Sequence, residues 1–427
     1  MLVGTQVRRV AIVGGARIPF VRAMGAYAEC SNQDMLTAAL QGLVGKFGLA
    51  GQRIGDVGAG AVLKHPRDFN LTREAVLSTA LAPQTPAFDL QRACGTSLET
   101  AIVLGLKIAI GQIDSAIAAG VDTASDAPIG VSEGLRRILL KSARGRSVGE
   151  RVAPWLGLRP SHFKPSLPAV TEPRTALSMG QSCELMAQRW KISREAQDRL
   201  VYDSHMRAAA AYDLGFHSDL LVEFRGVRAD DILRRDTSLE RLAKLKPAFP
   251  MPGSATLTAG NSTPMTDGAA AVLLASEDWA RERELPIQAY LSYGKVAAVD
   301  FVHDEGLLMA PAYAVPRMLA DAGLGLQDFD FYEIHEAFAA QVLCTLAAWE
   351  SAEYCRDRLG LAAPLGAIDR GKLNVNGGSL ALGHPFAATG ARILAALAKA
   401  IDQRGGGRGL ISICTAGGMG VTAIVEK

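Results

Sequence analysis

The chain has 427 residues, of which 49% are hydrophobic and 21% are charged, which is the composition of a globular protein large enough for two or three domains. Its formal net charge of +2 gives no argument for a nucleic-acid partner, and no run of apolar residues reaches the roughly 18 that a membrane-spanning helix needs. We therefore expect a cytoplasmic protein that binds no nucleic acid.

The first predicted element is a strand over residues 10–13, followed by a turn at Gly14 and Gly15. The residues around it lack the apolar core and the cleavage site of a signal peptide. The cysteines lack the spacing of a zinc site, a CxxC redox pair or a disulfide framework, so each one alone is most simply a small buried hydrophobic residue. The six cysteines are Cys30, Cys94, Cys183, Cys344, Cys355 and Cys414.

The segment DLQRACGTSLETAIVLG, residues 89–105, ends a predicted strand and begins a helix that is apolar on nearly every side. Such a helix is expected in the interior of the molecule. Cys94 lies on the turn between the two elements, at the helix N-terminus. Because the helix dipole and exposed amides favour a negative charge there, we expect the pKa of the Cys94 thiol to be lowered.

The next region, residues 124–253, has a different composition and is predicted to be a domain inserted into the first half of the chain. Its residues 131–170 contain eight basic side chains but only two acidic ones, Glu133 and Glu150. This basic stretch is consistent with a solvated face, with attraction of a polyphosphate ligand, or with contact to an anionic membrane or an acyl-carrying partner. The basic residues are Arg136, Arg137, Lys141, Arg144, Arg146, Arg151, Arg159 and Lys164.

Two segments of the chain look like variations of one unit, which runs strand, glycine-bearing turn, helix, strand. The first begins at AFDLQ and the second at KLNVN. Short apolar strands that alternate with helices indicate an α/β architecture. We therefore predict a duplicated fold, with an N-terminal half formed by residues 1–123 and 254–285 and a C-terminal half formed by residues 286–427.

Reactive side chains stand among glycines at four places: Cys94 in RACGTS, His335 in EIHEAFAAQ, His384 in LALGHPFAATG and Cys414 in SICTAGGMG. A cysteine paired with a histidine is an activated nucleophile, in which the imidazole takes the proton of the thiol. Neighbouring glycines let a substrate approach backbone N–H groups that can hold an oxyanion. This combination predicts nucleophilic catalysis.

Each of these motifs also has a structural explanation. His335 could be a hydrogen-bonded core histidine, and His384 with Pro385 could form only a tight turn. HEAFA lacks the second histidine of HExxH, so the local spacing does not support a metal at His335. The glycines of RGGGRG precede a predicted strand, so they favour a helix stop over a phosphate-binding loop.

In their order along the chain, RACGTS, GNSTPMTDGAA, HEAF, GHP and CTAGG resemble the thiolase family from end to end. The resemblance implies a five-layered αβαβα fold and cleavage of 3-ketoacyl-CoA by CoA, with no cofactor or metal. It implies that Cys94 is the nucleophile, His384 its base and Cys414 the second acid and base. His335 would line the oxyanion hole for the thioester oxygen, and the N–H groups of Cys94 and Ala416 would hold the oxyanion at the ketone carbon.

The sequence departs from common thiolase patterns at several points. HEAF and CTAGG replace the frequent NEAF and CxGGG, which puts His335 in place of an asparagine and Ala416 at an oxyanion position. SMG stands where biosynthetic members have HMG. The CoA contacts implied by the resemblance are Ser178, Met179, Phe249 and Thr263.

HEAF, SMG and the long basic loop are similar to the thiolase subunit of fatty-acid oxidation complexes. That subgroup implies a homodimer or tetramer, acyl-CoA and CoA as substrates, and a partner with hydratase and 3-hydroxyacyl-CoA dehydrogenase activities. The alternatives are an acetoacetyl-CoA thiolase, a decarboxylating ketoacyl synthase of the same fold, and a non-catalytic CoA-binding or scaffold subunit. Cys414 argues against the synthase, and the four intact reactive residues argue against a scaffold.

Overall fold

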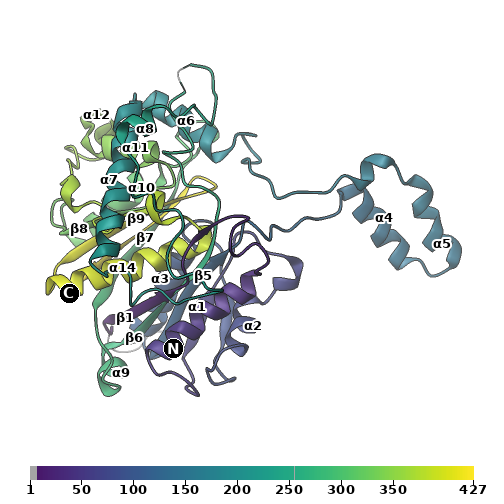
Figure 1. Cartoon of the computed structure of the whole chain (residues 1–427), viewed down its shortest axis with the longest axis horizontal. Helices are drawn as coiled ribbons and strands as arrows, with labels where there is room; N and C mark the ends of the chain where they lie inside the picture. Colours follow the sequence, from purple (N-terminus) through teal and green to yellow (C-terminus); the bar gives the residue numbers. More distant parts are fainter. Residues whose placement is uncertain (1–6, 254) are drawn as a thin grey trace.

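A computed structural model describes residues 7–253 and 255–427 of the chain. A body of stacked helices and strands carries one arm, formed by residues 130–166, whose two ends pair at Gly130 and Ser166 and which extends away from the body (Figure 1). Residues 1–6 and 254, which belong to the predicted N-terminal half, lie outside the described residues.

The strands of the described residues form one sheet of ten strands, in which the same arrangement occurs twice. In the first half, β3 is parallel to β5, β5 is antiparallel to β6, and β6 is antiparallel to β1. In the second half, β8 is parallel to β9, β9 is antiparallel to β10, and β10 is antiparallel to β7. The strands are β1 (Val10–Arg17), β2 (Val21–Arg22), β3 (Asp56–Ala59), β4 (Ala87–Asp89), β5 (Ser115–Asp122), β6 (Thr266–Ser276), β7 (Ala289–Ala298), β8 (Phe331–Ile334), β9 (Arg408–Thr415) and β10 (Met419–Glu426).

The two half-sheets meet at β1 and β7, which pair antiparallel over only two positions, Ala11 with Tyr290 and Ile12 with Ala289. β4 extends the first half beyond β3, and β2 pairs with β6 at the side of the main strand order. The repeated order of the strands is therefore an internal symmetry of the fold about the joint between β1 and β7.

Helices cover both outer faces and fill the space between the half-sheets. The central layer consists of α3 (Thr96–Ala109) and α14 (Thr389–Arg404), which pack on each other and on strands of both halves. One outer layer contains α1 (Asn32–Lys46) and α2 (Leu71–Leu77), and the other contains α10 (Ala310–Ala322) and α11 (Ala339–Glu350), at opposite ends of the body in Figure 1. The expected five-layered αβαβα fold is confirmed.

The sheet strands are buried on both faces, as the layers require. Every residue of β1, β5 and β6 is buried, because helices lie on both sides of these strands. The layers approach closely at Gly120 in β5, where an added Cβ would lie 2.0 Å from the carbonyl oxygen of Ala387. That contact docks the segment before α14 directly on the sheet.

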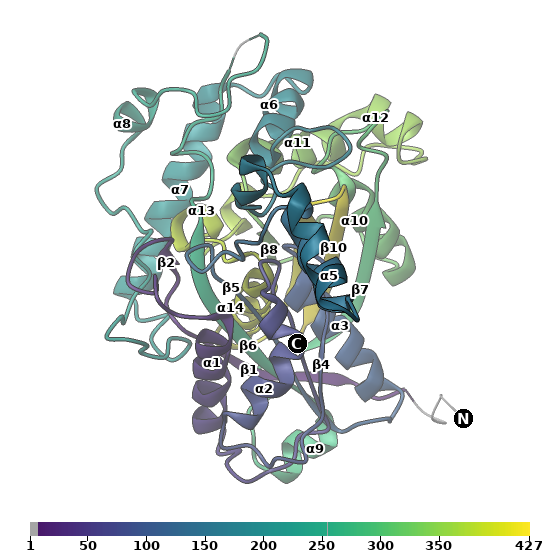
Figure 2. The same ribbon diagram turned by 90° about the vertical axis from the view of Figure 1, so that its right-hand side faces the viewer.

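The segment between β5 and β6 divides into the arm and a part that packs on the body. The arm carries α4 (Glu133–Arg144) and α5 (Val148–Val152), and it points toward the viewer in Figure 2. The packed part carries α6 (Met179–Arg189), α7 (Arg194–Asp213) and α8 (Leu239–Ala243). The remaining helical elements are α9 (Glu277–Glu282), α12 (Ala352–Asp357), α13 (Ser379–Leu382), η1 (Pro66–Asp68), η2 (Ala153–Gly157), η3 (Pro160–Phe163), η4 (Arg370–Lys372) and η5 (Phe386–Ala388).

Within the described residues, no helix combines the length and the apolar character needed to cross a membrane.

Candidate active site

Cys94 lies on the turn between β4 and the buried helix α3, where the sequence placed it. The turn is fixed by Thr96, whose hydroxyl accepts the N–H of Arg92 at 2.8 Å and donates to the carbonyl of Ala93 at 2.7 Å. Ala93 has a φ of 44°, a left-handed conformation that is uncommon for a residue with a side chain. The local structure thus holds Cys94 in a strained turn at the start of a central helix.

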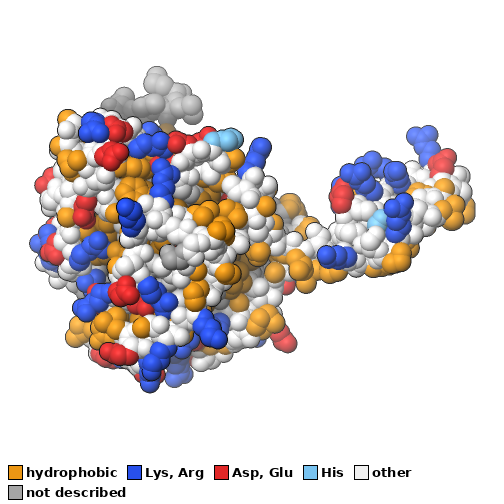
Figure 3. All heavy atoms as spheres, turned by 90° about the horizontal axis from the view of Figure 1, so that it is seen from above, with side chains coloured by type: hydrophobic (Ala, Val, Ile, Leu, Met, Phe, Trp, Pro, Cys, Tyr) orange, Lys and Arg blue, Asp and Glu red, His pale blue; other side chains and the backbone are white. Residues whose placement is uncertain are grey.

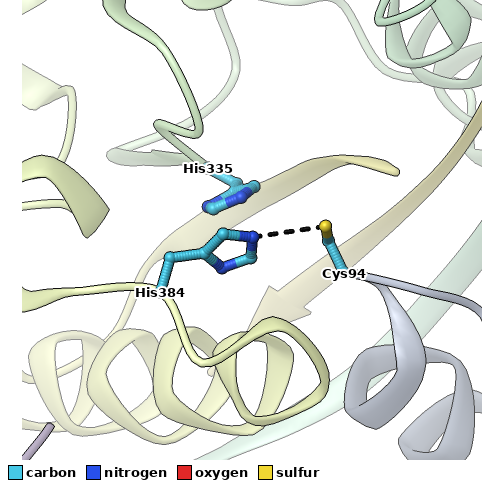
Figure 4. Close-up of side chains that lie close together, drawn as sticks. All are labelled: Cys94, His335 and His384. Atoms are coloured by element: carbon cyan, nitrogen blue, oxygen red, sulfur yellow. Dashed lines mark hydrogen bonds between the residues drawn. The ribbon is translucent and has the colours of Figure 1, made fainter. Parts of the chain in front are cut away.

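His384 lies directly opposite Cys94. Its Nε2 is 3.2 Å from the Cys94 sulfur, and its Nδ1 is 2.6 Å from the hydroxyl of Thr389, the first residue of α14 (Figure 4). The backbone N–H of His384 donates to the hydroxyl of Thr266 in β6 at 2.8 Å. Because Nδ1–H can donate to Thr389, Nε2 is free to accept the proton of the thiol.

His335 follows β8 and lies against His384, with 4.1 Å between the ring centroids and an angle of 50° between the ring planes. Its Nδ1 is 2.8 Å from the hydroxyl of Ser379, which also accepts a hydrogen bond from the buried guanidinium of Arg392 at 2.7 Å. Its Nε2 has no hydrogen-bond partner among the described residues. A buried polar atom without a hydrogen bond costs the folded protein free energy. A ligand that bonds to His335 Nε2 would remove this cost.

The next residue, Glu336, is also buried and ties three segments together behind the histidines. Its carboxylate accepts hydrogen bonds from Asn374 at 2.6 Å, from Ser204 of α7 at 2.8 Å and from the N–H of Leu380 at 3.2 Å. Burial raises the pKa of this carboxyl. Glu336 therefore fixes His335 relative to α13 and to the packed part of the inserted segment.

Cys414 and Ala416 come from the end of β9 and the turn that follows it. Cys414 is buried, and its pKa is raised well above the usual value by burial and by the nearby Cys94 sulfur. The backbone N–H groups of Ala416 and of Cys94 itself lower the pKa of the Cys94 thiol. The turn is held by Glu172, whose carboxylate accepts the N–H of Gly417 at 2.8 Å.

The protonation state of the pair differs from the sequence prediction. The Cys94 thiol was expected to have a lowered pKa, but burial raises it to about 12 even though the two N–H groups lower it. Burial also lowers the pKa of His384 to about 3. The prediction was wrong because a charge at this helix start must be desolvated, and desolvation outweighs the dipole. The resting pair is a neutral thiol and a neutral imidazole.

A cavity of about 660 Å³ opens between the packed part of the inserted segment and the loop before β6. None of the four reactive residues is among those that line it, but Leu380, which follows Ser379 in the chain, is. Phe249 and Thr263 line it, together with the basic residues Arg22, Arg234 and Arg241. Apolar surface and cationic groups in one cavity suit a ligand with an aliphatic arm and phosphates.

The other two predicted CoA contacts, Ser178 and Met179, are not among the residues that line this cavity. The Ser178 hydroxyl caps α6 by accepting the N–H of Gln181 at 3.2 Å. The ring of Phe249 packs on Gly180, the next residue of α6, so closely that an added Cβ there would be 2.3 Å away. Met179 and Phe249 pack against the same hydrophobic cluster.

Several residues of the site were not found from the sequence. Ser379 and Thr389 orient the two imidazoles. Thr389 lies within the quoted motif LALGHPFAATG and Ser379 directly precedes it. Ser262, whose buried hydroxyl has no partner among the described residues, lines the cavity beside Thr263. Polar residues embedded in an apolar motif were the available signal.

The eight basic residues of the basic stretch lie on the arm and the segments that join it to the body. Figure 3 shows Lys and Arg side chains along one side of the arm and hydrophobic side chains along the other. Glu133 bonds both Arg136 and Arg137, at 2.7 and 2.8 Å, and so offsets only one of their two charges. The exposed hydrophobic residues of the arm include Val148, Val152, Leu156 and Phe163.

Comparison with known protein families matches both halves of the chain to the same family. Residues 10–278 match the family model described as "Thiolase, N-terminal domain" and residues 285–427 match "Thiolase, C-terminal domain". The chain therefore belongs to the thiolase family, whose members are acyltransferases.

Among curated relatives, the chain is 39% identical over 431 residues to the 3-ketoacyl-CoA thiolases of Yersinia pestis (strain Pestoides F) and Yersinia pseudotuberculosis serotype O:3 (strain YPIII), covering 100% of this chain and 98% of each relative. Among solved structures, it matches the acetyl-CoA acetyltransferase of Bacillus anthracis with a TM-score of 0.82 and 28% identity, covering 99% and 100% of the two chains. It matches human mitochondrial 3-ketoacyl-CoA thiolase in complex with CoA with a TM-score of 0.80 and 28% identity, covering 98% of each chain.

Proposed function

We propose that this chain is a 3-ketoacyl-CoA thiolase that transfers an acyl group to CoA through an acyl-cysteine intermediate. The observation that carries the proposal is the buried contact of 3.2 Å between His384 Nε2 and the Cys94 sulfur. A thiol that faces an oriented imidazole, with backbone N–H groups on the sulfur, is equipped to attack a carbonyl carbon. The curated relatives named above support the choice of 3-ketoacyl-CoA as substrate.

In the first half-reaction, Cys94 attacks the 3-keto carbon while its proton moves to His384 Nε2. This transfer at the moment of attack suits a pair that is neutral at rest. The oxyanion at the ketone carbon accepts hydrogen bonds from the N–H groups of Cys94 and Ala416. The bond between the second and third carbons then breaks and leaves an acyl group on Cys94, and Cys414 protonates the enolate to give acetyl-CoA.

His384 and His335 stabilise the enolate as it forms. His384 carries the thiol proton on Nε2, and the Nε2 of His335, which has no other partner among the described residues, faces the same space. In the second half-reaction, Cys414 takes the proton of a new CoA thiol, and the CoA sulfur attacks the acyl-cysteine to form a shortened acyl-CoA. The bond between the acyl group and Cys94 breaks, and the Cys94 thiolate that leaves takes its proton back from His384. The proposed reaction needs no metal or organic cofactor.

The cavity of about 660 Å³ is the proposed binding site of CoA. Phe249 and Thr263 would contact its pantetheine arm and adenine end, and the lining arginines would meet its phosphates. Met179 would support Phe249 through the hydrophobic cluster that both contact, and Ser178 would fix the start of α6, where Gly180 packs on Phe249. The CoA complex of a solved structural relative supports this use of the fold.

The wider organisation is part of the same proposal. We divide the chain into an N-terminal half (1–123 and 254–285), an inserted loop domain (124–253) and a C-terminal half (286–427), which the repeated strand order supports. We propose a homodimer or tetramer, a hydratase and 3-hydroxyacyl-CoA dehydrogenase subunit as partner, and peripheral contact of the arm with anionic membranes. The six free cysteines favour a reducing compartment such as the cytoplasm.

The test is CoA-dependent thiolysis of 3-ketohexadecanoyl-CoA beside acetoacetyl-CoA, followed by loss of substrate absorbance, with Cys94→Ala as the inactive control. Strong cleavage of the long substrate is the expected result. Cleavage of acetoacetyl-CoA alone would favour the acetyl-CoA acetyltransferase activity named for the structural relative from Bacillus anthracis. Failure to cleave either substrate, with or without a hydratase–dehydrogenase partner, would contradict the proposal.

A further inference from the structure

The catalytic centre has a second property that the thiolase reaction does not use. The Cys94 sulfur and one ring nitrogen each of His335 and His384 lie within 4.8 Å of one another, and all three residues are buried. Figure 4 shows the two imidazoles and the thiol facing a common space. One thiolate and two imidazoles form a ligand set that suits zinc.

The geometry is close to that of a tetrahedral site with one open position. Zinc–sulfur and zinc–nitrogen bonds of about 2.3 and 2.05 Å place neighbouring ligand atoms roughly 3.3–3.6 Å apart. The pair of His384 Nε2 and Cys94 Sγ, at 3.2 Å, is a few tenths of an ångström closer than that spacing, so the two atoms would move slightly apart on binding. Since no two of the three ligand atoms are more than 4.8 Å apart, a small rotation of the His335 ring completes the set.

His335 would bind the metal through its Nε2 atom. Its Nε2 is buried and has no hydrogen-bond partner among the described residues, whereas its Nδ1 is held by Ser379. The Ser379 hydroxyl can accept from Nδ1–H, which leaves a lone pair on Nε2, or donate to Nδ1, which leaves Nε2–H as a donor. The same nitrogen can thus bind a cation or an oxyanion, but not both together.

The second nitrogen of each imidazole is anchored in the way that metal sites require. Ser379 holds His335 at 2.8 Å and Thr389 holds His384 at 2.6 Å, which fixes both rings with their free nitrogens toward Cys94. Such outer hydrogen bonds orient histidine ligands and raise their affinity for metal. The site is therefore preorganised, and binding requires little rearrangement.

We propose that Cys94, His335 and His384 bind a divalent zinc-type cation, which occupies the catalytic centre in place of substrate and inhibits the enzyme reversibly. The metal–sulfur bond forms as the Cys94 thiol gives its proton to solvent, and a chelator that removes the metal restores the thiol. No electron is transferred. The spacing of residues along the sequence could not indicate this site, because its ligands come from three separate motifs.

Binding is tested without any acyl-CoA, so that its failure is distinct from failure of the proposed function. Cobalt(II) is titrated anaerobically into the purified full chain, and the charge-transfer absorbance of a cobalt–thiolate bond is recorded; zinc is then added to displace it. We expect one cobalt per chain. The His335→Asn variant, which keeps an amide of similar reach, should bind cobalt at least tenfold more weakly. The matched control is Cys355→Ser, a buried cysteine of α12 whose sulfur donates to the carbonyls of Ala348 and Trp349, away from the three ligands.

A second measurement needs no variant. Alkylation of wild-type Cys94, verified by peptide mass spectrometry, should abolish the cobalt band, and bound zinc should protect Cys94 from alkylation. Absence of the band, equal cobalt affinity in folded His335→Asn, or a band that survives alkylation of Cys94 would each overturn the proposal.

Discussion

Replacing Thr389 by valine tests whether His384 acts as the base that takes the thiol proton. Valine has nearly the same shape, so the change removes the hydrogen bond of 2.6 Å to His384 Nδ1 and little else. That bond is worth about 1 kcal/mol to a neutral imidazole and about 2–3 kcal/mol to the imidazolium formed when Cys94 attacks. The difference, about 1–2 kcal/mol, raises the barrier to acylation and slows it about 5- to 30-fold.

Thr389→Val also leaves the buried Nδ1–H of His384 without a hydrogen-bond partner, so the free energy of unfolding should fall by about 1–3 kcal/mol. The assay is the single-turnover rate of Cys94 acylation, measured by quenched mass spectrometry on folded protein. Thr345→Val is the matched control, because the Thr345 hydroxyl donates to the carbonyl of Gln341 within α11, away from the site. It should lose stability without slowing acylation. An acylation rate in Thr389→Val equal to that of the wild type would refute the role of His384.

Three other predictions concern the second thiol, the resting proton and the arm. Cys414→Ser should slow overall turnover far more than acylation of Cys94 by a simple acyl-CoA, and equal losses would argue against proton transfer by Cys414. Because burial raises the pKa of Cys94 to about 12, its alkylation rate should rise about tenfold per pH unit from pH 7 to 10 as the thiolate fraction grows, whereas a plateau would indicate a stable thiolate. Replacing Arg136, Arg137 and Lys141 by alanine should weaken sedimentation with anionic vesicles and leave neutral vesicles unaffected; unchanged binding would mark these residues as a solvated face.

The parts of the site that could be predicted from the sequence are those that local motifs specify. Cys94 was placed at a helix start because a polar turn precedes an apolar helix, and the structure confirms that position. The layered α/β fold followed from alternating strands and helices and from the family resemblance. Cys94 and His384, which are far apart in the sequence, were paired through that resemblance alone, since no local pattern measures the distance between them.

What could not be predicted depends on burial and on long-range contacts. The pKa of Cys94 was predicted in the wrong direction because a helix N-terminus is visible in the sequence, whereas complete desolvation is not. The Ser178 hydroxyl caps α6, a use that the capping pattern with Gln181 could have indicated, and its contact with CoA stays a prediction. The basic stretch gave no sign that it would stand away from the body as an arm.

The position of β10 has a consequence for how the chain acquires activity during synthesis. β10 is the last strand of the described chain, yet it lies between β7 and β9 in the interior of the sheet. Until β10 has been synthesised, β9 has no antiparallel neighbour, and the turn that carries Ala416 lacks the strand that follows it. A nascent chain can therefore contain Cys94, His335 and His384 and still lack a formed oxyanion turn until β10 has been synthesised.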